Sequence, residues 1–214
     1  MHLFFYGPND YLIHAQVKKI KDRYREKAGG DLNLTTLDGD TMEMGEFARQ
    51  TMAVPLLSSS RLVIVKNIFK NKKKDVLDQV KNTLDKIPDS TVVIFSNSGN
   101  VDKRLGLFKA LNKPKISKFF DDLPTSKLRE FIKNEVKGKD GRISNAAENL
   151  LAQFIPRDLW RMSNEIDKLV SFTKDREIGA KDVENLVISS VEGNVFSLIE
   201  YMASGKTDRA LVEL

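Results

Sequence analysis

The stretch "LFFYGPNDYLIHAQVKKI", residues 3–20, places an apolar run, a glycine loop and an amphipathic segment one after another. Residues 3–6 predict a buried strand, and the residues from Asp10 onward predict a helix. Many nucleotide-binding domains begin with this order of strand, loop and helix, and their loop holds a phosphate. The stretch therefore indicates an α/β fold and raises the question of a nucleotide site.

Short apolar runs continue to alternate with longer amphipathic segments through the first 120 residues. Strands are expected at residues 3–6, 32–37, 61–65, 91–95 and 116–120, and helices at about 10–27, 43–53, 73–86 and 102–112. Near-continuous apolar runs rich in β-branched residues are typical of strands buried on both faces of a parallel sheet. The alternation predicts a doubly wound α/β domain over residues 1–122.

After residue 122 the apolar residues recur only at helical spacing. Thr125 or Ser126 and then Ser144 are expected to cap helices, Gly138 to end one, and Pro156 to separate two. We therefore expect a small all-α domain over residues 123–193. Residues 194–214 predict two more helices, which cannot bury a core alone, so we expect them to begin a truncated helical third domain.

Composition excludes several kinds of site. The chain has no cysteine and two histidines, so neither a thiolate metal site nor a histidine-rich zinc site is expected. It shows no signal peptide and no apolar segment that approaches 18 residues, so we expect a cytoplasmic protein. Residues 1–122 carry 21 Lys and Arg against 15 Asp and Glu, an excess compatible with a polyanionic partner but common without one.

The glycine loop lacks the residues of a phosphate-binding P-loop. That motif, G-x-x-x-x-G-K-[ST], uses glycines to wrap the phosphates, a lysine to reach the outer ones and a hydroxyl to hold magnesium. Here Gly7 is followed by Leu12, Ile13 and His14 at the last three motif positions. Asp10 would also bring a carboxylate to an anion site, and we interpret it as the N-cap of the first helix. No nucleotide cofactor or metal is expected.

Two segments of the first domain each have a structural and a functional interpretation. In "TMAVPLLSSSR", residues 51–61, an apolar turn interrupts the pattern, formed by Val54, Pro55, Leu56 and Leu57. The turn either packs onto the sheet or forms an exposed plug for a partner's pocket. In "KNIFKNKKKD" the lysines are either a solvated surface or a contact to a nucleic-acid backbone, made by Lys70, Lys72, Lys73 and Lys74.

Six segments, taken in order, resemble the delta subunit of the bacterial DNA polymerase III clamp loader. They are "YGPNDYLIHAQVKKI", "PLLSSSRLVIVKN", "VVIFSNSGNVDKRLGLFKAL", "LREFIKNEVKGKDGRISNAAENLLAQF", "DLWRMSNEIDKLVSF" and "NVFSLIEYMASGKTDRAL", and together they cover essentially the whole chain. The resemblance implies an AAA+-like α/β domain, a helical lid domain and a collar domain, of which residues 194–214 would be the start.

The resemblance also implies a function and a set of partners. Members of this family bind the ring-shaped β sliding clamp through the first domain and open it for loading onto primed DNA. They do not hydrolyse ATP, although they belong to a holoenzyme with DNA-directed DNA polymerase activity. The partners would be the clamp, the other clamp-loader subunits through the collar, and DNA within the assembled loader, with no cofactor and no membrane.

The resemblance assigns roles to particular residues. The clamp-binding positions are Val54, Pro55, Leu56 and Leu57, and Leu57 replaces a bulky aromatic residue found in some members. At the points of ATP contact, Lys66 and Asn67 follow the third strand instead of an acidic pair, and Trp160 stands where the sensor-2 arginine would be. Asn97 occupies the sensor-1 position and is interpreted as a remnant.

Two alternatives remain open on the sequence. One is an active AAA+ or P-loop-type ATPase with a degenerate loop. The other is a stand-alone DNA-binding α/β domain that uses the lysines at positions 70, 72, 73 and 74.

Overall fold

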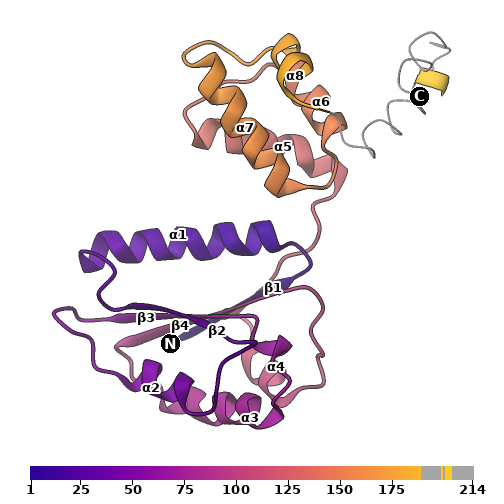
Figure 1. Cartoon of the computed structure of the whole chain (residues 1–214). Helices are drawn as coiled ribbons and strands as arrows, with labels where there is room; N and C mark the ends of the chain where they lie inside the picture. The colour runs from indigo at the N-terminus through magenta and orange to yellow at the C-terminus, as the bar shows by residue number, and fades with distance from the viewer. Residues whose placement is uncertain (189–198, 200, 204–214) are drawn as a thin grey trace. The chain divides into compact units, whose positions relative to one another are not determined.

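The structure is a computed structural model that describes residues 1–188, 199 and 201–203, and it divides the chain into two compact units between Asp122 and Leu123 (Figure 1). Each unit is described separately. The helical third domain expected over residues 194–214 lies almost wholly outside the described residues and stays a prediction.

The first unit is built on a five-stranded, all-parallel sheet with the strand order β2-β3-β4-β1-β5. Its elements are β1 (His2–Gly7), α1 (Asp10–Ala28), β2 (Leu34–Asp38), α2 (Glu46–Met52), β3 (Arg61–Lys66), the 3₁₀ turn η1 (Ile68–Lys70), α3 (Lys74–Thr83), the 3₁₀ turn η2 (Leu84–Lys86), β4 (Thr91–Ser98), α4 (Gly106–Leu111) and β5 (Ser117–Phe119). The predicted α/β fold class is confirmed.

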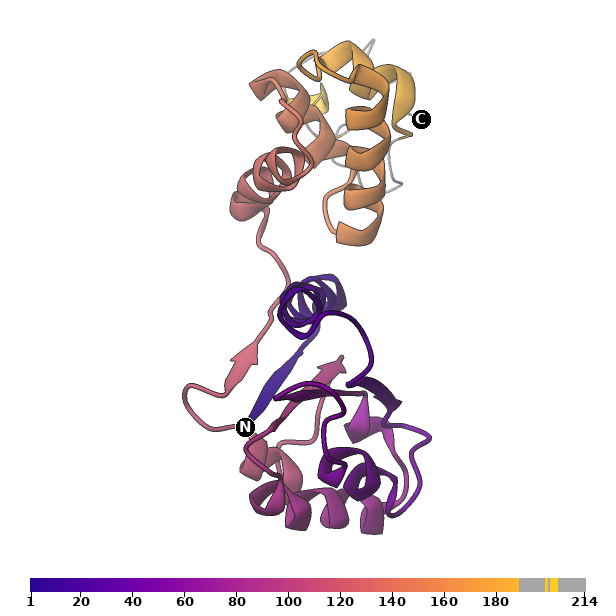
Figure 2. The same ribbon diagram turned by 90° about the vertical axis from the view of Figure 1, so that its left-hand side faces the viewer.

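Helices cover both faces of this sheet. Figure 1 shows α1 on one face and α2, α3 and α4 on the other, and Figure 2 shows the same layers along the axis of α1. Successive strand residues point to opposite faces. On β3, Val63 and Val65 therefore join the core under α2 to α4, whereas Leu62 and Ile64 join the core under α1. This double burial explains why the strands are continuous apolar runs.

The N-cap of α1 lies one residue earlier in the chain than the sequence indicated. The N-cap is Asn9, whose Oδ1 accepts a hydrogen bond from the Leu12 N–H at 3.0 Å. Asp10 is the first helical residue, so its assignment as the cap was wrong. Asn9 has the extended backbone that a cap needs, and a carboxylate one position later still interacts favourably with the positive end of the helix.

Two other helices and one strand are shorter than predicted. The helices expected at 43–53 and 102–112 cover only Glu46–Met52 and Gly106–Leu111. The strand expected from residue 32 begins at Leu34, because the Leu34 N–H closes a turn onto the Asp31 carbonyl at 2.9 Å. Leu32 therefore lies in this turn and is 63% exposed.

The second unit packs α5 (Thr125–Gly138), α6 (Asn145–Phe154), α7 (Leu159–Thr173) and α8 (Ala180–Leu186) around a small apolar core. Ser144 caps α6 as predicted, and its Oγ accepts from the Ala147 N–H at 3.3 Å. Neither Thr125 nor Ser126 caps α5, since the helix begins at Thr125 directly after Pro124. Gly138 is the last residue of α5 rather than the residue that stops it.

Gly7 allows a close approach between two segments of the first unit. Its φ is +141°, and a Cβ atom at this position would lie 2.1 Å from the Phe120 carbonyl oxygen. Phe120 is in turn fixed to the start of the chain, because its N–H donates to the Tyr6 carbonyl at 2.8 Å and its carbonyl accepts from the Asn9 N–H at 3.3 Å. The end of β5 thus lies directly against the β1–α1 loop.

We predict that Gly7→Ala destabilises the first unit by about 3 kcal/mol or more, because it adds a main-chain clash to an unfavourable φ. Gly30→Ala is the matched control, since Gly30 has a φ of +134° but open space around its Cβ position. Its cost should be about 1–2 kcal/mol. Urea unfolding followed by circular dichroism measures both, and equal losses would show that the contact with Phe120 is unimportant.

Candidate functional site

The loop of residues 53–60 joins α2 to β3 and carries the apolar turn identified in the sequence. Val54, Leu56 and Leu57 are 84%, 60% and 92% exposed, while Pro55 is partly buried. These side chains therefore do not pack onto the sheet, and the structural interpretation of the turn was wrong for all three. Scattered exposed leucines are ordinary, but three large apolar side chains exposed within four residues make this loop a candidate interaction site.

The apolar surface extends beyond the predicted residues. Met52, the last residue of α2, is partly exposed, and Leu32 lies in the turn before β2 next to Asn33, which bonds the loop. We call the set Leu32, Met52, Val54, Leu56 and Leu57 the apolar patch. Leu32 was missed because the alternation in "LNLTTL" includes it in a strand.

Hydrogen bonds fix this loop at its two ends and near its middle. At its start, the Thr91 hydroxyl donates to the Thr51 carbonyl at 3.1 Å, and at its end the Tyr24 hydroxyl donates to the Ser60 carbonyl at 2.9 Å. In the middle, the side chain of Asn33 bonds both main-chain groups of Leu56. Between these anchors Leu57 has a φ of +55°, a left-handed conformation that costs a leucine about 1–2 kcal/mol.

The topology places this loop at the amino end of the sheet. The loop precedes β3, Asn33 precedes β2 and Thr91 begins β4, and parallel strands bring these points to one edge. Ligand crevices of open parallel sheets lie at the opposite edge, outside the carboxyl ends of the strands. The apolar patch is therefore separate from the edge where a nucleotide would bind.

At the carboxyl edge, the β1–α1 loop already uses main-chain donors that an anion would need. The Asn9 N–H donates to Phe120, and the Leu12 N–H donates to the Asn9 side chain. A phosphate at a helix N-terminus is held by such N–H groups.

The other predicted ATP-contact residues have structural partners. Asn97, at the end of β4, is buried and accepts a hydrogen bond from the Phe69 N–H at 3.2 Å, which fixes η1 to the sheet. At the end of β3 the Asn67 N–H donates to the Ser96 carbonyl at 2.7 Å. Trp160 is the second residue of α7 and is partly exposed. Within the described part of the chain, no group of three or more acidic, histidine or cysteine side chains is placed to hold a metal ion.

The predicted lysines gather at the start of α3. Lys70 ends η1, Lys72 and Lys73 precede the helix, and Lys74 is its first residue. Lys73 is already engaged, since its Nζ lies 2.7 Å from both carboxylate oxygens of Glu43. Helix N-termini carry a partial positive charge, so the lysines and the helix together present a positive surface.

A basic cleft of about 270 Å³ was not predicted. It lies between α1 and the strands β2 and β3, and its basic lining comprises His14, Lys18, Lys21, Arg25 and Lys66. Arg25 is paired with Asp31 and Asp22, which neutralises part of this charge. The spacing of Lys18, Lys21 and Arg25 places them on one helix face, which is the signal that could have revealed the cleft.

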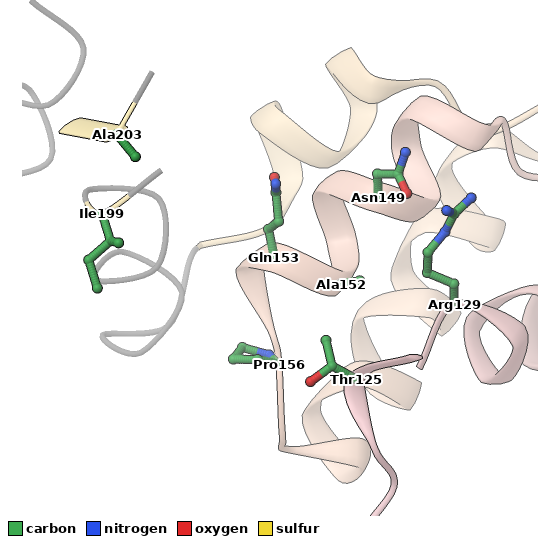
Figure 3. Close-up of a pocket in the computed structure, with 8 residues that line it drawn as sticks. All are labelled: Thr125, Arg129, Asn149, Ala152, Gln153, Pro156, Ile199 and Ala203. Carbon is green, nitrogen blue, oxygen red and sulfur yellow. The ribbon is translucent and has the colours of Figure 1, made fainter. Parts of the chain in front are cut away.

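A second cavity, of about 530 Å³, lies in the second unit (Figure 3). Its lining includes Arg129 of α5 and Asn149, Ala152 and Gln153 of α6. The charged group of this wall is already paired, because the Arg129 Nε lies 2.9 Å from the buried carboxylate of Glu148. The eight lining residues include no carboxylate, histidine or lysine that could serve as an acid or a base.

None of the helices in the described ranges is both long and apolar enough to cross a membrane.

Comparison with known proteins agrees with this architecture. A curated protein, DNA polymerase III subunit delta of Bacillus subtilis, is 28% identical over 215 residues, and the match covers 96% of this chain and 62% of the relative. The structure of the Bacillus subtilis DNA clamp loader delta protein superimposes with a TM-score of 0.64 at 25% identity, over 99% of this chain and 65% of the other. The chain thus spans less than two thirds of the length of these relatives.

Domain III of the replication initiation protein DnaA from Thermotoga maritima shares the fold, with a TM-score of 0.55 at 16% identity, over 87% of this chain and 82% of the other. The α/β architecture of this chain is thus shared with a second replication protein. The profile of the family described as DNA polymerase III, delta subunit, matches residues 3–119, which is more than half of the chain. This chain therefore belongs to the DNA polymerase III delta subunit family.

Proposed function

We propose that this chain binds the sliding clamp through its apolar patch and helps to open the clamp for loading onto primed DNA. It would act in the cytoplasm with the other clamp-loader subunits. The observation that carries the proposal is the exposure of Val54, Leu56 and Leu57 on an anchored loop, in a chain of the delta subunit family. A subunit that opens a ring must bind it firmly, and the apolar patch is a surface suited to that binding.

The physical basis of this binding is the burial of leucine side chains with little loss of conformational entropy in the loop. Full burial of a leucine stabilises a complex by about 1.5–3 kcal/mol relative to exposure. A loop that is ordered before binding loses less conformational freedom when the complex forms. Anchoring at Thr51, Leu56 and Ser60 supplies this order.

The same geometry supports a role without ATP hydrolysis. The β1–α1 loop lacks the lysine and the second glycine of a P-loop, and its N–H groups at Asn9 and Leu12 have protein partners. We propose that the delta chain is a mechanical subunit and that nucleotide chemistry belongs to other members of the loader.

We predict that Leu56→Ala combined with Leu57→Ala weakens clamp binding more than 100-fold, about 3 kcal/mol, because two anchors of the patch are removed. Isothermal titration calorimetry with the matching sliding clamp measures the affinity. Met44→Ala is the control, since Met44 is also exposed but follows β2 at the opposite edge of the sheet. An unchanged affinity in the double variant would refute the assignment of the patch.

A fluorescent ATP analogue tests the rival ATPase. We expect no micromolar binding, because the groups that would hold the phosphates are missing or engaged. Anisotropy titration of the chain, with and without magnesium, measures it. A dissociation constant in the micromolar range would favour an active or nucleotide-regulated subunit over the mechanical one.

DNA contact is a second candidate, favoured by the positive surface at the start of α3. We predict that Lys72→Gln combined with Lys74→Gln, in the full-length subunit within the assembled loader, weakens DNA binding and lowers the salt-dependence slope by about 2. Clamp affinity should not change. Lys18→Gln with Lys21→Gln removes the same charge from the cleft on α1 and serves as the control. Equal effects of both pairs would mean that net charge alone matters, and strong salt-dependent duplex binding by this chain alone would favour the stand-alone DNA-binding domain.

A further inference from the structure

We propose that Asn33 is a positioning residue for the clamp-binding loop: its buried side-chain amide holds the main chain of Leu56 and so presents the apolar patch in its binding conformation. This inference rests on the proposed clamp binding. It assigns a role to a residue that lies outside the loop. Asn33 would affect clamp binding indirectly, through the conformation that it imposes on the loop.

The contact between Asn33 and the loop is two-sided. The Asn33 Oδ1 accepts a hydrogen bond from the Leu56 N–H at 2.7 Å, and its Nδ2 donates to the Leu56 carbonyl at 2.7 Å. Asn33 is 3% exposed, so this pairing occurs away from solvent. The side chain acts on Leu56 as a neighbouring strand would, and it fixes both the position and the orientation of one peptide segment.

Asn33 is itself held rigidly. Its carbonyl accepts the Leu62 N–H at 2.9 Å, which connects it to β3 near the end of the loop. The Tyr24 hydroxyl lies 3.3 Å from the same carbonyl and 2.9 Å from that of Ser60. Burial raises the pKa of Tyr24 further above neutral pH, where a tyrosine hydroxyl is protonated in any case and can donate. Hydrogen bonds thus connect the loop to α1, through Tyr24, and to the sheet, through Asn33 and Leu62.

The consequence of this bracing is felt at Leu57. With Leu56 fixed on one side and Ser60 on the other, Leu57 is kept in its left-handed conformation with its side chain almost fully exposed. A loop released from Asn33 can leave this conformation, which is costly for a leucine. The clamp would then have to order the loop again at each binding event, at the expense of affinity.

The residue type matters because the pairing needs one donor and one acceptor. Aspartate is nearly identical in shape but cannot donate to the Leu56 carbonyl and would place a carboxylate oxygen against it. Asn33→Asp is therefore the sharpest variant, and Asn33→Ala removes both bonds. A matched control exists in Asn71, a buried asparagine whose Nδ2 bonds the carbonyls of Gly39 and Met42 after β2, at the opposite edge of the sheet.

The experiment compares clamp affinity by calorimetry and amide hydrogen exchange for the wild type, Asn33→Asp, Asn33→Ala and Asn71→Ala. We expect both Asn33 variants to bind the clamp at least 10-fold more weakly. The Leu56 amide should exchange faster in Asn33→Ala, which removes its acceptor, whereas the Leu62 amide, bonded to the main chain of residue 33, should stay protected in both variants. Asn71→Ala should bind normally even if its thermal stability falls as much. In the background of Leu56→Ala and Leu57→Ala, Asn33→Asp should cause no further loss.

The outcomes separate this inference from the proposal on which it rests. If the wild type does not bind the clamp, the proposed function fails, whatever the Asn33 variants do. If the wild type binds and both Asn33 variants bind equally well, although the Leu56 amide of Asn33→Ala exchanges faster, clamp binding does not depend on the two hydrogen bonds and the inference is overturned. A loss of affinity in Asn71→Ala as large as that in Asn33→Ala would attribute the effect to general destabilisation and would also overturn it.

Discussion

Burial of the central sheet on both faces leaves its two ends as the places where strands meet loops at the surface. β3 shows the constraint most clearly, because its four central residues all lie in one of the two cores. Every strand–helix connection of the first unit must therefore emerge at the amino or the carboxyl edge. The edge at which a segment emerges follows from chain direction alone, since all the strands are parallel. The separation of the apolar patch at one edge from the β1–α1 loop at the other results from this geometry.

At the carboxyl edge of the sheet, several residues make contacts that hold the fold together. Asn97 supports η1, Asn9 caps α1, and Gly7 accommodates Phe120. The two asparagines each accept a hydrogen bond from a main-chain N–H, and the glycine leaves room for the Phe120 carbonyl. A buried main-chain donor or acceptor without a partner is costly, so these contacts stabilise the fold.

The sequence was sufficient for the parts of the structure that depend on local pattern. Apolar runs identified the five strands, and Ser144 was recognised as a cap from its position before a helical repeat. It could not distinguish Asn9 from Asp10 as a cap, because adjacent residues of nearly equal propensity compete for that position. It also assigned Leu32 to a strand, since alternation does not reveal a turn closed by main-chain hydrogen bonds.

The exposure of the apolar residues in the loop could not be predicted from local sequence pattern, for a different reason. The main chain of Leu56 is bonded by the side chain of Asn33, 23 residues away, and a pairing over that distance has no signature in a single sequence. The basic cleft is similar, since Lys66 joins the face of α1 only through the sheet. The resemblance to the delta family gave the positions of the loop residues, whereas the structure gave their exposure and their anchors.

The contact of Phe120 with the β1–α1 loop also has a mechanical meaning. Phe120 is the last residue of the first unit with main-chain bonds to β1 before the connection at 121–124, and it is bonded on both sides, to Tyr6 and to Asn9. β1 lies between β4 and β5, so it is an interior strand of the sheet. A force applied through the connection would reach the first unit at the end of β5, an edge strand, and would load the hydrogen bonds of Phe120 with Tyr6 and Asn9 before it reached β1. These two hydrogen bonds therefore decide whether β5 stays on the sheet or separates from β1 when the connection is pulled.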